Sequence, residues 1–202
     1  MPNWCKNRIE IEAKSAADAD FLISAFKDKE DEGRDFSFNS IIPRPKQLSI
    51  VQGSVTSMAR KYLEAVENAK TPEEFKKLEE EWREEVKDTD CDEWGGSDED
   101  INFGKGYDAF VKYAQAVAKN ISEFGSPTWY EWSIKNWGTK WDASSTQLTQ
   151  RGDMLIFEFR TAWSAPIPIF EYIAEHFADH IESMSVNCVE RGCGYYLDEQ
   201  YI

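Results

Sequence analysis

A tryptophan-rich motif contains the side chains best suited to bind a ligand or a partner. Residues 136–142 read NWGTKWD, in which two flat amphipathic tryptophan rings alternate with polar groups. An arginine follows on the next predicted strand. The candidate binding residues are Asn136, Trp137, Lys140, Trp141, Asp142 and Arg160. A structural role is the favoured alternative, because Gly138 permits a turn and tryptophans in a small α+β core usually serve packing.

Two histidines could form part of a metal site. His176 and His180 are four residues apart on the predicted last helix, so they should share one of its faces. The motif is not HExxH, and no third ligand is evident. We therefore expect two exposed histidines near a helix C-terminus, where positive charge is favoured, and no metal.

The cysteines and the wider sequence show no catalytic signature. None of the four cysteines (Cys5, Cys91, Cys188 and Cys193) forms a CxxC, and the last two are half a metal site at most. We expect free thiols. The chain contains no GxSxG, Walker A or suitably spaced Cys–His pair. These features predict no catalytic residues, no cofactor and no enzymatic activity.

The charge of the chain is strongly negative and unevenly distributed. The formal net charge is −15, which argues against direct binding of nucleic acid, since phosphates require positive charge. Residues 64–100 contain 16 acidic and 5 basic residues, a local charge of −11. A solvated helix face is the ordinary explanation. The functional alternative is a surface for a basic partner, in the extreme case an imitation of DNA. The acidic candidates are Glu73, Glu74, Glu79, Glu80, Glu81, Glu84 and Glu85.

Hydrophobic periodicity predicts the elements that position these groups. Alternation predicts strands over 7–13, 36–42, 154–163 and 184–188, and a strand or hairpin before residue 154. Ser15 caps a first helix, and Pro166 and Pro168 open the last one. Between the two halves, the pattern predicts helices from Met58, after Thr71 and over 107–124, with a loop over 88–100.

One face of the predicted sheet should be open and charged. Its side chains are Arg8, Glu10, Glu12, Glu158 and Arg160. An ionic ladder between strands is the ordinary explanation, and a docking surface is the alternative. Charges at this position argue against the base stacking seen in RNA-binding domains of this topology.

The element order predicts an α+β, ferredoxin-like (split βαβ) fold. Residues 1–45 and 129–202 form an antiparallel sheet covered by two helices, and residues 46–128 form a large acidic helical insertion. Four suitably spaced cysteines would be needed for an iron–sulfur cluster, and they are absent from the sequence.

Several short motifs resemble those of the YubB ferredoxin-like family of bacteriophage and plasmid proteins. They are MPNWC with Asn7, IIPxP at 41–45, NWGTKWD at 136–142 and TAWSxP at 161–166. The resemblance covers roughly residues 1–45 and 129–202. It implies the same fold and an origin on a mobile element, and it implies no catalytic residues.

Three functions remain open. The favoured one is a non-enzymatic binding module that acts on a protein partner through the tryptophan motif or the insertion. The second is an acidic antagonist of a host nucleic-acid-binding or defence protein. The third is a small-ligand binder or enzyme with a concave site at Trp137, Lys140, Trp141 and Arg160. No signal sequence or membrane span is apparent, so we expect the bacterial cytoplasm and no membrane partner.

Overall fold

The chain forms two compact units, which are described separately. The computed structural model describes residues 3–92, 101–192 and 194–202. The sheet unit comprises Met1–Pro43 and Ser133–Ile202, and the helical unit comprises Arg44–Trp132. The predicted Met1-Pro2 motif residues, Cys193 and residues 93–100 of the predicted loop lie outside the described residues. None of the described helices is long and apolar enough to cross a membrane.

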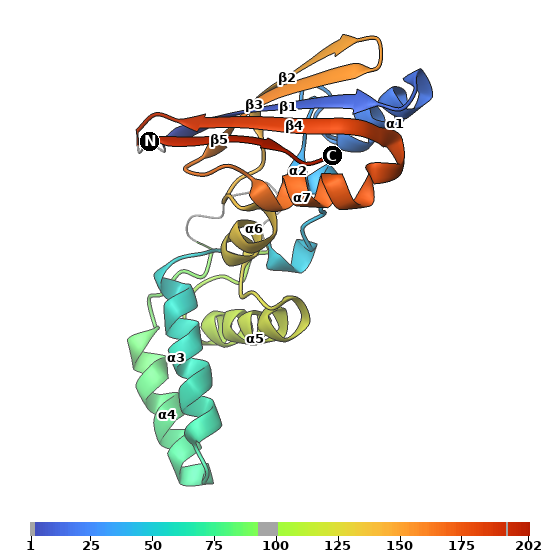
Figure 1. The fold of residues 1–202 in the computed structure, drawn as a ribbon. Helices are drawn as coiled ribbons and strands as arrows, with labels where there is room; N and C mark the ends of the chain where they lie inside the picture. Colours follow the sequence, from blue (N-terminus) through green and yellow to red (C-terminus); the bar gives the residue numbers. More distant parts are fainter. Residues whose placement is uncertain (1–2, 93–100, 193) are drawn as a thin grey trace. The chain divides into compact units, whose positions relative to one another are not determined.

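The sheet unit contains a five-stranded antiparallel sheet in the order β2-β3-β1-β4-β5 (Figure 1). The strands are β1 (Trp4–Ala13), β2 (Ser144–Arg151), β3 (Met154–Ala162), β4 (Ile181–Glu190) and β5 (Tyr195–Gln200). Helices α1 (Ala16–Phe26) and α7 (Ile167–His176) lie on the same side of the sheet. The order β1-α1-β2-β3-α7-β4, with β1 and β3 central, is the ferredoxin-like fold that the sequence predicts.

Alternation along β1 decides which side chains enter the core. Cys5, Asn7, Ile9, Ile11 and Ala13 are buried, and the residues between them are partly or fully exposed. The predicted cap of α1 is confirmed, since the Asp18 amide donates a 3.2 Å hydrogen bond to Ser15 Oγ.

Aromatic rings fill the space between the sheet and its helices. Phe36 stacks on Phe159 with ring centroids 4.8 Å apart, and Phe26 meets Phe157 edge-on at 5.7 Å. All four rings are buried. Burial of each phenylalanine stabilises the fold by about 1.5–3 kcal/mol.

The predicted strand over residues 36–42 is wrong. The segment contains the short helix α2 (Phe38–Ile41), which buries Phe38 and Ile41. The carboxylate of Asp142 accepts hydrogen bonds from the first amides of this helix, which favours helical over extended backbone. The second strand of the fold is instead β2, which comes after the helical unit and forms a hairpin with β3.

The last part of the sheet unit also differs from prediction. Helix α7 ends at His176, and a 3-10 turn over Ala178–His180 leads into β4. Strand β3 ends at Ala162, where Trp163 takes a left-handed φ of 74°. Residues predicted as a short tail form β5, which pairs with β4 along the edge of the sheet.

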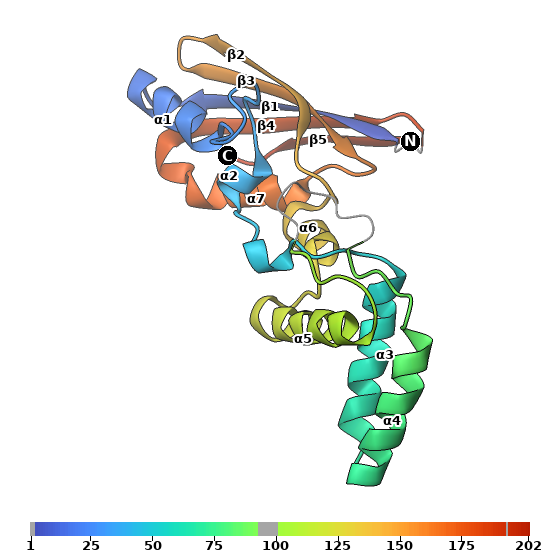
Figure 2. The same cartoon turned by 180° about the vertical axis from the view of Figure 1, so that it is seen from behind.

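The helical unit is built from three long helices (Figure 2). They are α3 (Ser54–Asn68), α4 (Pro72–Glu85) and α5 (Tyr107–Phe124), and α3 and α4 lie side by side. The core forms mainly between α3 and α5, around Phe110 and Tyr113. The predicted capping box of α4 is confirmed, with reciprocal hydrogen bonds between Thr71 and Glu74. A further helix, α6 (Trp129–Trp137), crosses the boundary between the units and was not predicted.

Candidate functional site

The open face of the sheet presents an ordered set of charged side chains. In the pairing register, Lys6 lies opposite Arg160, and Arg8 lies opposite Glu158. On the other side of β1, Arg8 lies opposite Asn187. Successive side chains of a strand point to opposite faces, so all of these project away from the buried face of β1. The predicted outward side chains of β1 and β3 are therefore where the sequence placed them.

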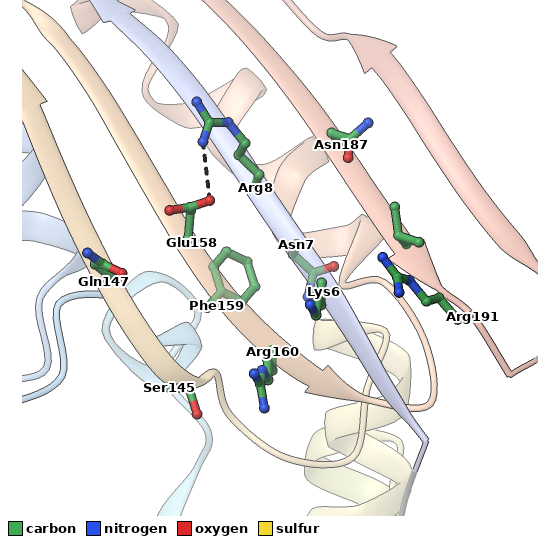
Figure 3. Close-up of a pocket in the computed structure, with 11 residues that line it drawn as sticks. Lys6, Asn7, Arg8, Ser145, Gln147, Glu158, Phe159, Arg160, Asn187 and Arg191 are labelled. Carbon is green, nitrogen blue, oxygen red and sulfur yellow. Dashed lines mark hydrogen bonds and ion pairs between the residues drawn. The ribbon is translucent and has the colours of Figure 1, made fainter.

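These side chains surround a hollow of about 390 Å³ (Figure 3). Strands β1 to β4 and the turn after β4 supply its walls. Its charged lining consists of Lys6, Arg8, Glu158, Arg160 and Arg191. Its neutral polar side chains are Ser145, Gln147 and Asn187, and Asn7 borders it from the strand while its side chain is buried on the other face. Four cations and one carboxylate make the hollow basic in a chain whose net charge is −15.

One cation of the hollow already has carboxylate partners. Arg8 lies 2.6 Å from a Glu10 oxygen and 3.2 Å from a Glu158 oxygen. The hydrogen bond to Glu10 raises the pKa of Arg8 above its ordinary value, although burial opposes this. Among the described residues, no carboxylate lies within ion-pair distance of Lys6, Arg160 or Arg191. These three cations therefore account for the positive character of the hollow.

The NWGTKWD motif is divided between buried and exposed positions. Trp137 is 2% exposed, and its indole donates a 3.0 Å hydrogen bond to the Ile42 carbonyl. Trp141 is 42% exposed, and the Lys140 ammonium lies 3.9 Å from the centroid of its ring. Of the predicted binding residues, only Arg160 lines the hollow. Asn136 is partly buried at the end of α6.

Asp142 joins the motif to helix α2. Its carboxylate accepts hydrogen bonds from the Phe38 amide at 2.6 Å, the Asn39 amide at 3.3 Å and the Ser37 hydroxyl at 2.8 Å. The guanidinium of Arg34 lies 3.6 Å away. Burial raises the pKa of Asp142, and the hydrogen bonds and Arg34 act in the opposite direction. Asp142 therefore stabilises the start of helix α2 although it lies far from that helix in the sequence.

Two of the motifs in the family resemblance, NWGTKWD and TAWSxP, are hydrogen-bonded to one another. Ser164 Oγ donates to the Gly138 carbonyl at 2.6 Å, and Thr139 Oγ1 donates to the Ala162 carbonyl at 2.9 Å. Thr161 Oγ1 donates to the Ser164 carbonyl at 2.6 Å and accepts from Asn7 at 2.9 Å. These residues form a hydrogen-bonded network in which Asn7, Thr139 and Thr161 are buried, which explains why polar side chains occur there.

Gly138 is required by close packing at this network. Its φ is +76°, and an added Cβ would lie 2.8 Å from Pro168 Cδ. An L side chain there would need both a left-handed backbone and movement of the start of α7. Backbone conformation and packing therefore explain why the motif has glycine at position 138.

The acidic candidates lie on α4, an exposed helix. No residue of α4 is buried. Several glutamates have local partners: Glu74 in the capping box, Glu79 with Arg83, Glu81 with Lys77 and Glu84 with Lys87. Among the described residues, no basic group lies within ion-pair distance of Glu73, Glu80 or Glu85.

The histidines do not share a helix face, contrary to prediction. His176 ends α7 and stacks on Tyr172, with centroids 3.8 Å apart. His180 belongs to the following turn, and its Nδ1 lies 2.6 Å from an Asp18 carboxylate oxygen. No cluster of three or more metal-ligating side chains is found in the part of the chain that the structure describes.

The described cysteines are buried. They are Cys5, Cys91 and Cys188. Burial raises the pKa of Cys91 to about 11 and that of Cys188 to about 12. A raised pKa disfavours the thiolate, which is the reactive form.

Sequence reasoning missed most of the lining of the hollow. Lys6 was missed because the first strand was predicted to begin at Asn7, although the alternation of β1 extends to it. Arg191 and Asn187 could be assigned only after the register of β4 against β1 was known. Ser145 and Gln147 belong to β2, whose boundaries the residue pattern does not define.

Comparison with known proteins gives a fold and no activity. A solved structure titled "Crystal structure of a protein api92 from Yersinia pseudotuberculosis" is similar at 11% identity. The match covers 100% of this chain and 94% of that one, with a TM-score of 0.48. No curated protein matches the chain. Residues 136–196 match a family model described as "Ferredoxin-like domain in Api92-like protein", and this segment of the chain is similar to that domain.

Proposed function

We propose that this protein is a non-enzymatic binding module whose helix α4 binds a basic protein partner. The observation that carries the proposal is that no residue of α4 is fully buried, and only Leu78 and Trp82 are even partly buried. Most helical stability in proteins comes from packing an apolar face. Helix α4 packs only a narrow stripe, in which Trp82 stacks on Phe110, so most of its surface is free to contact a partner.

The side chains of α4 favour a protein over a small ligand. Phe75 is 44% exposed and lies on the opposite side of the helix from Glu73 and Glu80, by helical spacing. The glutamates without a local basic partner can pair with lysines or arginines of another protein. Charges at the edge of a protein–protein interface mainly speed association and select the partner.

The charge density of α4 favours a basic protein patch over imitation of DNA. Seven glutamates, two lysines and one arginine leave four net negative charges on the helix. Fourteen residues span about 21 Å at a rise of 1.5 Å per residue. This is one charge per roughly 5 Å, whereas duplex DNA carries one per about 1.7 Å. DNA imitation remains the second candidate, and α4 supplies about a third of the required density.

A variant of α4 with three fewer negative charges tests the proposal. The variant changes Glu73, Glu80 and Glu85 to glutamine, which leaves the capping box and the ion pairs of α4 in place. A control removes the same charge from exposed positions of the sheet unit, at Glu171, Glu175 and Glu182. Each purified protein is used as bait in nuclease-treated bacterial lysate at physiological salt.

The expected result is a basic protein retained by the wild type and the control and lost by the α4 variant. Retention of the same protein by the α4 variant would show that α4 is not the contact. If the wild type retains no protein, the proposed function is wrong. The family resemblance adds to the proposal a bacterial cytoplasmic location and an origin on a bacteriophage or plasmid, so the lysate should come from a host of such elements.

A further inference from the structure

We infer that the basic hollow on the open sheet face binds a small ligand with a phosphate group, of about the size of a mononucleotide. This site belongs to the sheet unit and has the opposite charge from α4. It is therefore independent of the proposed function.

The first argument is electrostatic. Lys6 and Arg160 lie directly opposite each other on neighbouring strands, and both are exposed. Like charges in this position destabilise a sheet. Arg191 adds a third cation to the same hollow. A bound anion would convert this repulsion into charge-assisted hydrogen bonds, and arginine can bind phosphate through two parallel bonds.

The second argument comes from the backbone of β2. The register of β2 against β3 shifts between Ser144 and Gln147, and Ser145 has a φ of 53°. A serine in the left-handed region is uncommon, and β-bulges often redirect a side chain near a functional site. Ser145 and Gln147 both line the hollow (Figure 3). The irregularity thus places neutral hydrogen-bonding groups beside the cations.

The surroundings limit the ligand to one phosphate group. The adjacent hollow on the same face is lined by Glu10 and Asp198 together with Arg8. A polyanion that continued along the sheet would meet these carboxylates, so a nucleic acid strand is disfavoured. The volume of about 390 Å³ is within the range of small-molecule sites, about 300–1,000 Å³.

An exposed ring near the cations favours a nucleotide over other phosphate esters. Trp4 precedes Lys6 by two residues, points to the same face of β1 and is 39% exposed. Aromatic rings bind heterocyclic bases by stacking, which contributes about 1–3 kcal/mol per base in nucleic-acid complexes. A ligand with its phosphate between Lys6 and Arg160 can place a base toward this ring.

Titration calorimetry with adenosine monophosphate tests the inference. Inorganic phosphate, ribose 5-phosphate and adenosine are titrated in parallel, at low salt and then at increasing salt. The variants are Arg160→Gln and Lys6→Gln. The control is Arg151→Gln, which removes an exposed arginine from the far end of β2.

Saturable binding of adenosine monophosphate is expected, weakened about tenfold or more by Arg160→Gln and Lys6→Gln and little by Arg151→Gln. Binding of inorganic phosphate but not adenosine would support phosphate recognition. The inference is wrong if none of the three phosphate-containing compounds binds the wild type, if adenosine binds as well as its monophosphate, or if Arg151→Gln weakens binding as much as the two site variants do.

Thermal unfolding without ligand provides a second readout. Lys6→Gln relieves the repulsion with Arg160, so its Tm should equal or exceed that of the wild type. Phosphate should raise the Tm of the wild type more than that of the variant, because the intact site binds it more tightly. An equal rise in both proteins would contradict the site.

Discussion

Replacement of Asp142 tests whether one carboxylate holds helix α2 in place of the predicted strand. Asp142 is 16% exposed at its side chain and accepts hydrogen bonds from the amides of Phe38 and Asn39 and the hydroxyl of Ser37. Loss of a helix cap costs about 1 kcal/mol, and each buried donor left unpaired costs about 1–3 kcal/mol. Asp142→Ala should therefore destabilise the sheet unit by about 2–4 kcal/mol.

The asparagine variant should be affected less than the alanine variant. Asparagine keeps one acceptor oxygen, and burial raises the pKa of Asp142, so the neutral side chain avoids part of the cost of a buried charge. Asp31→Asn is the control. Asp31 also lies near Arg34, at 3.9 Å, but its side chain is 60% exposed. This control removes the ion pair alone and should cost less than about 1 kcal/mol.

Urea unfolding and amide hydrogen exchange measure the effect. Urea gives the loss in the free energy of unfolding, and exchange at Phe38 and Asn39 reports the helix itself. Faster exchange at these two amides should accompany the loss of stability. If Asp142→Ala costs no more than Asp31→Asn and leaves both amides protected, the carboxylate does not determine α2.

Three further predictions concern a glycine, a carboxylate and the buried cysteines. Gly138→Ala should lower the free energy of unfolding by about 2–4 kcal/mol, because the added Cβ meets both a left-handed φ and a clash with the start of α7. The control Gly152→Ala has a φ of +62° but open space around it, so it should cost only about 1–2 kcal/mol. Equal shifts in Tm for the two variants would refute the packing argument. Hydrogen bonds with His180 and Ser15 hold the pKa of Asp18 below 3.8, so its stabilisation is present above that pH and is lost as the pH falls through the lowered value. Acid unfolding curves should therefore show a smaller loss of stability for Asp18→Asn than for the wild type, and parallel curves would contradict this. In a Cys193→Ser background, a thiol reagent should modify the native protein slowly and the unfolded protein quickly; rapid modification of the native form would show that the described thiols are accessible. These thiols are Cys5, Cys91 and Cys188.

Local patterns in the sequence were sufficient for the elements that have a strong period or cap. The alternation of β1, the Ser15 cap and the Thr71–Glu74 box all occur as predicted, because neighbouring residues alone determine them. The alternation of β3 likewise identified the open face. The order of the predicted strands and helices was then sufficient to predict the ferredoxin-like fold.

Contacts between residues far apart in the sequence determine the two elements that were predicted incorrectly or left open, α2 and β2. Residues 36–42 have an extended-looking pattern, and Asp142, about a hundred positions later, makes them helical. The second strand could not be assigned to β2 without its pairing with β3.

The candidate site shows the same limit most clearly. By itself, the sequence established an acidic chain with a ferredoxin-like fold and charged residues on an open sheet face. It did not show that Lys6, Arg160 and Arg191 surround one hollow, because they come from three parts of the chain. Strand register brings them together, and register is a property of paired strands that no single strand specifies.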